Sequence, residues 1–173
     1  MNKQQLIVLS SAIFLFCFLY FGLDNKPRAH KEIEQRRVEN AESTNINALM
    51  LDARKNLNAE QSTTLHSIDK ELKQEGLADS TKAGYLKQLS SRWFEFGHPA
   101  IAGYYAEQVA EIENNEDAWS IAGTSYTIGL QRSDDASVRD YCYRRALKAF
   151  ENAISMNPTE VNHRINLALL HVE

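Results

Sequence analysis

Beyond residue 45, apolar side chains recur every three or four positions, the spacing that aligns them on one face of an α-helix. Short helices are predicted over Ile46–Leu57 and Ala59–Leu72, and longer helices follow, separated by short polar or glycine-containing breaks. The 173 residues include only seven glycines and three prolines, which disfavours a turn-rich β fold. The pattern predicts an all-α protein in which residues 46–80 form N-terminal capping helices and residues 81–173 form further stacked helices.

The N-terminal third carries a different pattern, a single unbroken apolar run. Leu6 to Leu23 make up eighteen residues without a charge. A helix of that length spans about 27 Å, close to the roughly 30 Å hydrocarbon core of a bilayer. The bulky residues that follow lack the small-x-small pattern of a signal peptidase site, so we expect an uncleaved transmembrane anchor within residues 1–23. A cleaved, secreted form is the alternative, and the charged residues 24–45 are predicted to be a linker.

Positive charges set the expected orientation of this anchor. Lys3 alone precedes the apolar run, whereas five basic residues follow it: Lys26, Arg28, Lys31, Arg36 and Arg37. The positive-inside rule therefore favours a single-pass membrane protein with its helical domain on the cytoplasmic side. The margin is small, so the periplasmic side remains open.

Small and aromatic residues repeat along the predicted helices, and the clearest set is Trp119, Gly123, Tyr126, Ala146, Phe150, Ala153 and Pro158. A small residue lets two helices approach closely, and a ring fills the space between neighbouring helix pairs. This set resembles the tetratricopeptide repeat family, a 34-residue helix–turn–helix unit with the pattern W-x2-L-G-x2-Y, A-x3-F and P. The resemblance implies an α-solenoid over residues 81–173, with packing positions in the flanking units at Leu89, Trp93, Gly97, Ala102, Leu167 and Ala168.

The spacing between helices departs from the family's pattern in the middle unit. Nine residues separate Trp93 from Ala102, but twenty separate Tyr126 from Ala146. The sequence therefore predicts about eleven extra residues, either as longer helices or as a protruding loop around Asp134 and Asp135.

The end of the sequence predicts the start of a further unit. Asn157 is expected to cap the last helix, with Pro158 at its first position and Glu160 at its third, the arrangement of a capping box. The sequence ends within this unit, before a partner helix, so we expect it to be truncated in its last repeat.

Composition gives no support to catalysis. The net charge is −4 with both signs interspersed, and the basic stripe that nucleic acid requires is missing, so no nucleic acid partner is expected. The five histidines have no partners at metal-ligand spacing, and Cys17 and Cys142 are interpreted as ordinary apolar thiols. No phosphate-binding, dinucleotide-binding, zinc-protease or nucleophile-elbow motif occurs. We therefore predict no catalytic residues, no metal and no cofactor.

A peptide-binding groove is what the family resemblance implies instead, because the first helix of each pair lines a concave surface in such solenoids. The candidate groove positions are Lys87, Ser91, Phe94, Ser120, Thr124, Thr127 and Asn162. The family's best-known peptide readers use Lys, Arg and Asn at these places to clamp a terminal carboxylate. Only Lys87 and Asn162 are of those types, so that clamp is not expected.

The expected function is a membrane-anchored scaffold for protein–protein interaction or complex assembly, without catalysis. It resembles tetratricopeptide proteins of the bacterial inner membrane, and more distantly the anchored import receptors of organelles. A protein or peptide partner is expected, and self-association is left open. Two alternatives are the sensor or regulatory portion of a longer signalling enzyme, and a periplasmic assembly factor of the cytochrome c biogenesis type.

Overall fold

The computed structural model describes residues 46–171 and, before them, positions 2, 4, 5, 11, 14–16 and 18. Every regular element in these residues is a helix, which confirms the all-α prediction for this part of the chain. A helix over residues 46–55 is followed by α3 (Ala59–Leu72), α4 (Asp79–Glu95), α5 (Pro99–Glu113), α6 (Glu116–Arg132), α7 (Ala136–Met156) and α8 (Val161–Leu170).

The predicted anchor and linker, residues 1–23 and 24–45, lie almost wholly outside the described positions. Across the positions that are described, no helix has both the length and the apolar composition needed to cross a bilayer. The membrane anchor over Leu6 to Leu23 therefore stays a prediction.

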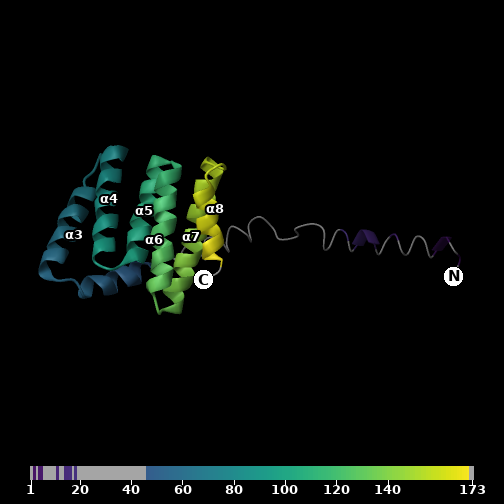
Figure 1. The fold of residues 1–173 in the computed structure, drawn as a ribbon, viewed down its shortest axis with the longest axis horizontal. Coiled ribbons are helices and arrows are strands. Elements are labelled where there is room, and N and C mark those ends of the chain that lie inside the picture. The colour runs from purple at the N-terminus through teal and green to yellow at the C-terminus, as the bar shows by residue number, and fades with distance from the viewer. Residues whose placement is uncertain are drawn as a thin grey trace. The chain divides into compact units, whose positions relative to one another are not determined.

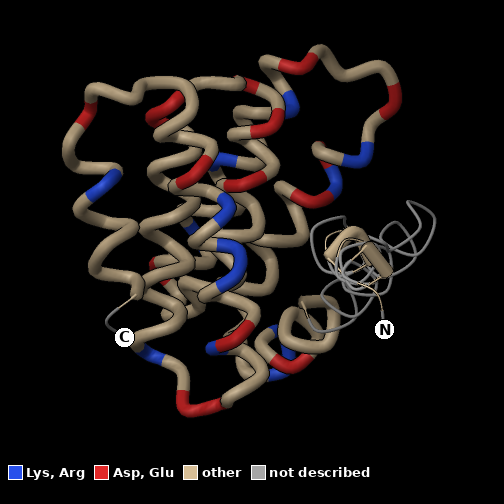
Figure 2. The backbone as a smooth tube through the Cα atoms, turned by 90° about the vertical axis from the view of Figure 1, so that its right-hand side faces the viewer, with Lys and Arg blue, Asp and Glu red and all other residues tan. Residues whose placement is uncertain are grey.

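Helices α3 to α8 stack in chain order within the unit Glu42–Glu173 (Figure 1). Each helix packs mainly against the one before it and the one after it, and smaller contacts join α5 to α7 and α6 to α8. Charges of both signs are spread over this helical domain (Figure 2). Serial packing of nearest neighbours is the arrangement of an α-solenoid, in which no helix pair buries its apolar face alone.

Two aromatic rings lie directly on glycines of the preceding helix. A Cβ added to Gly103 of α5 would lie 2.7 Å from Cδ1 of Tyr126 in α6. A Cβ added to Gly123 of α6 would lie 2.6 Å from Cε1 of Phe150 in α7. Both rings are fully buried. Because carbon atoms do not approach so closely, only glycine allows α5 to meet α6, and α6 to meet α7, at this separation.

The N-terminal helices cover one end of the stack. Leu65 and Ile68 of α3 are buried in the same core as Leu89 and Trp93 of α4. Arg54 lies over the Trp93 ring, with its guanidinium carbon 5.5 Å from the ring centroid, and its Nη2 is 2.6 Å from a carboxylate oxygen of Asp69. The guanidinium thus ties the helix over residues 46–55 to both α3 and α4.

Gly97 ends α4, as the sequence predicts. Its φ of 86° is in the left-handed region, which glycine adopts without a steric penalty. The amide of Gly97 donates to the carbonyl of Phe94, and the amide of His98 donates to the carbonyl of Trp93. This pair of hydrogen bonds closes the helix end and lets Pro99 begin α5 directly afterwards.

The eleven extra residues of the middle unit lie inside helices, which confirms the alternative of longer helices and rules out a protruding loop around Asp134 and Asp135. The connection from α6 to α7 is as short as the one from α4 to α5, three residues in each case. Tyr126 and Ala146 correspond to Trp93 and Ala102 of the α4–α5 pair. Counted from these positions, α6 ends four residues later than α4 does, and α7 starts seven residues earlier than α5 does. Asp135 caps α7 by accepting from the amide of Ser137 at 2.7 Å, which fixes this early start.

The predicted start of the last helix is also wrong. Asn157 closes α7 instead of capping α8, because its side chain accepts from the hydroxyl of Thr159 at 2.7 Å and holds the next residues in a turn. Pro158 lies exposed in that turn. The helix α8 starts at Val161, and Glu160 caps it by accepting from the amide of Asn162 at 3.0 Å. The side chain of Asn157 accepts its hydrogen bonds within this turn, so it does not cap the first amides of α8.

We predict that Gly123→Ala lowers the free energy of unfolding by about 1–3 kcal/mol, because the new methyl group overlaps the Phe150 ring. Gly84→Ala is the matched control, since Gly84 lies inside α4 with nothing within 4 Å of an added Cβ. That change should raise stability by about 0.5–1 kcal/mol through helix propensity. Urea unfolding of both variants tests the contact, and equal shifts in the two would contradict it.

Candidate binding groove

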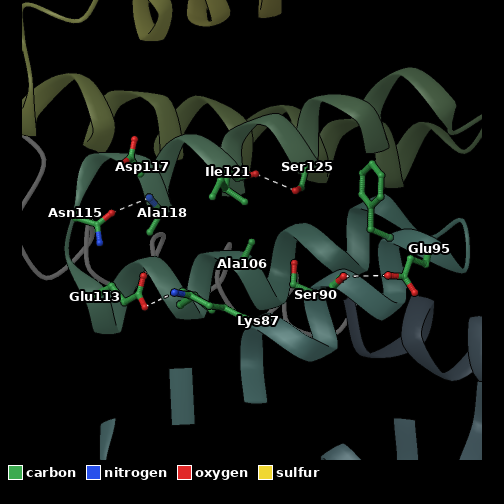
Figure 3. Close-up of a pocket in the computed structure, with 13 residues that line it drawn as sticks. Lys87, Ser90, Glu95, Ala106, Glu113, Asn115, Asp117, Ala118, Ile121 and Ser125 are labelled. Atoms are coloured by element: carbon green, nitrogen blue, oxygen red, sulfur yellow. Dashed lines mark hydrogen bonds and ion pairs between the residues drawn. The ribbon is translucent and has the colours of Figure 1, made fainter. Parts of the chain in front are cut away.

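A groove of about 760 Å³ lies between α4 and α6, with α5 as its floor. We call it the α4–α6 groove, and its size is in the range that holds a ligand of several side chains or a small molecule. Figure 3 shows Glu113, Asn115 and Asp117 at one end, Glu95 at the other end, and Ile121 between them. Its lining comprises Lys87, Ser90, Ser91, Phe94, Glu95, Ala106, Val109, Glu113, Asn115, Asp117, Ala118, Ile121 and Ser125.

Large apolar side chains lie on both walls of the groove, with Ile121 in its middle and Phe94 towards the Glu95 end. Phe94 projects from α4 with 39% of its surface exposed, and Ile121 projects from α6 with 60% exposed. The floor beneath them is made of small or β-branched side chains, Ala106 and Val109 from α5, together with Ala118 from α6. Small floor residues leave the two larger side chains uncovered, so an apolar group placed between them would remove surface from water.

The acidic end of the groove lies at the turn between α5 and α6. Glu113, at the end of α5, is paired with Lys87 of α4 at 2.5 Å, and this pair is partly exposed. Asn115 caps α6 by accepting from the amide of Ala118 at 2.9 Å, which places Asp117 in the first turn of that helix. This end therefore presents two lining carboxylates and one lysine that is already engaged.

At the opposite end of the groove, two arginines offset the negative charge of Glu95. Glu95 is 2.7 Å from Nη1 of Arg92 and accepts from the hydroxyl of Ser91 at 3.2 Å. The hydrogen bond from Arg92 lowers the pKa of Glu95 below its usual value. Arg132 lies over the Phe94 ring, with its guanidinium carbon 6.0 Å from the ring centroid. This end consequently carries two cations beside its one carboxylate.

The predicted groove positions fall on two hollows that share α6. Lys87, Ser91 and Phe94 line the α4–α6 groove. Thr124 and Thr127 line a smaller hollow of about 100 Å³ between α6 and α8, with Phe150 of α7 in its lining. Two further positions line neither hollow: Ser120, which is half-buried, and Asn162, which is exposed.

Sequence reasoning missed the residues that α6 gives to the groove wall, above all Ile121 and Ser125. Ile121 falls outside the stripe of Trp119, Ala122 and Tyr126 that faces the core. A large apolar residue on the polar side of an amphipathic helix is the signal that could have identified it.

The predicted repeat-packing residues divide into a buried group and an exposed group. Nine of them are buried: Leu89, Trp93, Ala102, Trp119, Gly123, Tyr126, Ala146, Phe150 and Ala153. Leu167 is half-buried against the core, whereas Gly97, Pro158 and Ala168 are exposed. The exposed members lie in turns or on α8, at the end of the described stack.

Comparisons with models of protein families, with curated proteins and with solved structures found no match to this chain. Among the described residues, no three His, Cys, Asp or Glu side chains lie close enough together to hold a metal ion.

A buried carboxylate, which no sequence motif indicates, lies on the side of α5 that faces α6 and α7. Glu107 is only 2% exposed. One of its oxygens accepts from the hydroxyl of Tyr126 at 2.9 Å and from Nε of Arg145 at 2.9 Å, and the other lies 3.1 Å from Nζ of Lys148. Tyr141 adds a hydroxyl contact to Tyr126 at 3.3 Å. Both carboxylate oxygens therefore have partners. Because these partners come from α6 and α7, the network joins three helices, α5, α6 and α7.

Burial raises the pKa values of the phenols and the thiol beside this network. The pKa of Tyr126 lies well above its usual value, through burial first and then the negative charge of Glu107. Burial likewise raises the pKa of Tyr141, and it raises the pKa of the Cys142 thiol to about 12. All three groups therefore stay protonated in the folded protein at pH values where they ionise in an unfolded chain.

We predict that Glu107→Ala lowers the free energy of unfolding by about 3–5 kcal/mol, because Arg145 and the Tyr126 hydroxyl lose their buried partner. Glu111→Ala is the control on the same helix, where the side chain is exposed and the change should stay within about 0.5 kcal/mol. Chemical denaturation measures both. Similar values for the two variants would show that the network does not hold the helices together.

We also predict that stability falls as the pH rises above about 9. An unfolded chain releases the thiol and phenol protons near pH 8.5 and 10, whereas the folded protein retains them, so stability is complete below those values and declines above them. Urea midpoints at about pH 8 and about pH 10.5 measure the effect. Tyr141→Phe should reduce the difference between the two midpoints, and a midpoint that does not change with pH would oppose this reasoning.

Proposed function

We propose that this chain is a non-enzymatic scaffold that holds a segment of a partner protein in the α4–α6 groove. The observation that carries the proposal is the groove itself, a hollow with exposed Phe94 and Ile121 on opposite walls. Large apolar side chains exposed together in a concave site are typical of surfaces that bind a partner.

The tetratricopeptide assignment belongs to the same proposal. It is supported by two successive contacts of one kind, the Tyr126 ring on Gly103 and the Phe150 ring on Gly123. The stacking of helices with their sequence neighbours also agrees with such a repeat. The apolar run Leu6 to Leu23 is proposed as the anchor that places this scaffold at a membrane.

Site-specific photo-crosslinking of the full chain in its native membranes tests the function. A photoreactive amino acid at Ile121 should give a discrete protein adduct, because that side chain lies in the groove. The matched control is Leu51, an equally large apolar residue that is 64% exposed on the helix over residues 46–55 and does not line the groove. Equal labelling from both positions, or none from Ile121, would count against a groove-bound partner.

A further inference from the structure

The α4–α6 groove has an apolar centre and one acidic end, and we propose that it binds a segment with matching chemistry. The ligand is a short stretch of a partner protein in which an apolar side chain is followed or preceded by Lys or Arg. The apolar side chain lies between Phe94 and Ile121, and the basic residue lies at the end marked by Glu113 and Asp117. This inference rests on the proposed function and adds the class of ligand and the end of the groove at which its basic residue lies.

The apolar centre selects one part of the ligand. Phe94 and Ile121 project from α4 and α6, and the small side chains of Ala106 and Ala118 beneath them leave room for an inserted group. An aliphatic or aromatic side chain would bury surface against both walls at once. A uniformly polar segment would leave that surface exposed to water.

The turn between α5 and α6 selects the charge of the ligand. Residues 111–117 contain four carboxylates, Glu111, Glu113, Glu116 and Asp117, and two of these, Glu113 and Asp117, line the groove. Lys87 is the basic residue of the lining, and Glu113 already engages it. Asp117 has no ion-pair partner among the described residues. A basic side chain is therefore attracted to this end, and an acidic ligand or a terminal carboxylate is repelled.

The two ends of the groove differ in charge, and this difference sets the end at which the basic residue of the ligand lies. At the far end, Arg92 is paired with Glu95, and Arg132 lies over Phe94. These two cations offset the carboxylate there, so a second basic residue of the ligand gains nothing at that end. The partly exposed Lys87–Glu113 pair is of the kind that contributes little to stability, so a ligand cation can replace Lys87 on Glu113.

Peptide binding to the full chain in a nonionic detergent tests this inference. The probes are three fluorescent peptides of about twelve residues that share the same leucines. They differ at one set of positions, which carries arginine in the first peptide, glutamate in the second and serine in the third. The arginine peptide should bind at least about tenfold more tightly than the glutamate peptide, and its affinity should fall as salt is added. Equal binding of the arginine and glutamate peptides would overturn the inference.

Two variants at the acidic end should change the affinity for the arginine peptide in opposite directions. Glu113→Gln together with Asp117→Asn should weaken the arginine peptide about tenfold. Lys87→Gln should strengthen it severalfold, because it leaves Glu113 without a competing cation. A gain in affinity cannot come from damaged folding. The matched control is Glu60→Gln together with Glu151→Gln, which makes the same change in net charge at exposed positions outside the groove and should leave binding unchanged.

The apolar centre is tested by Ile121→Ser, which should weaken all three peptides while leaving their order the same. Loss of binding in the Glu60–Glu151 control, or unchanged binding in the Glu113–Asp117 variant, would overturn the assigned charge. An Ile121 adduct to a second copy of this chain would also overturn it, since the groove would then be a self-association surface. If Ile121 captures a partner protein but the peptides show no preference for arginine, the ligand class fails and the scaffold function stands.

Discussion

The close approach of helix backbones at Gly103 and Gly123 is the constraint on which the rest of this domain depends. In each case a ring from the next helix lies where a side chain would otherwise be, so neighbouring helices meet at a short separation. The same close contact recurs between α5 and α6 and between α6 and α7. It brings Glu107 within hydrogen-bonding distance of Tyr126 and Arg145. The α5–α6 contact also sets one side of the groove, because α5 supplies its floor and α6 supplies the wall that carries Ile121.

The long helices of the middle unit have a structural role that a loop would not provide. The extra turns at the end of α6 include Gly129, where an added Cβ would meet the backbone of Ala100 and the sulfur of Cys142. Those at the start of α7 include Tyr141 and Cys142, both fully or nearly fully buried. The extension therefore packs onto the beginning of α5, and it adds Tyr141 to the Glu107 network.

Periodicity and turn chemistry predict most of the fold. The core stripe of Leu86, Leu89 and Trp93 follows from helical spacing, and the end of α4 follows from Gly97. The start of α8 could not be predicted in the same way, because Asn157 can cap a helix or close a turn, and only the contact with Thr159 decides between them. Long-range polar contacts are equally invisible. Glu107 and Arg145 are thirty-eight positions apart, and no local pattern distinguishes Glu107 from an exposed helix glutamate such as Glu111.

The helix α6 belongs to two structures at once. One of its sides carries Ile121 into the groove, and another carries Gly123 against the Phe150 ring. A shift of α6 would break the fit between the Phe150 ring and Gly123. The packing of the core therefore fixes the width of the groove. Side chains at the rim of the groove can therefore change without disturbing the core, whereas a change in the spacing of α6 and α7 lowers the stability of the fold.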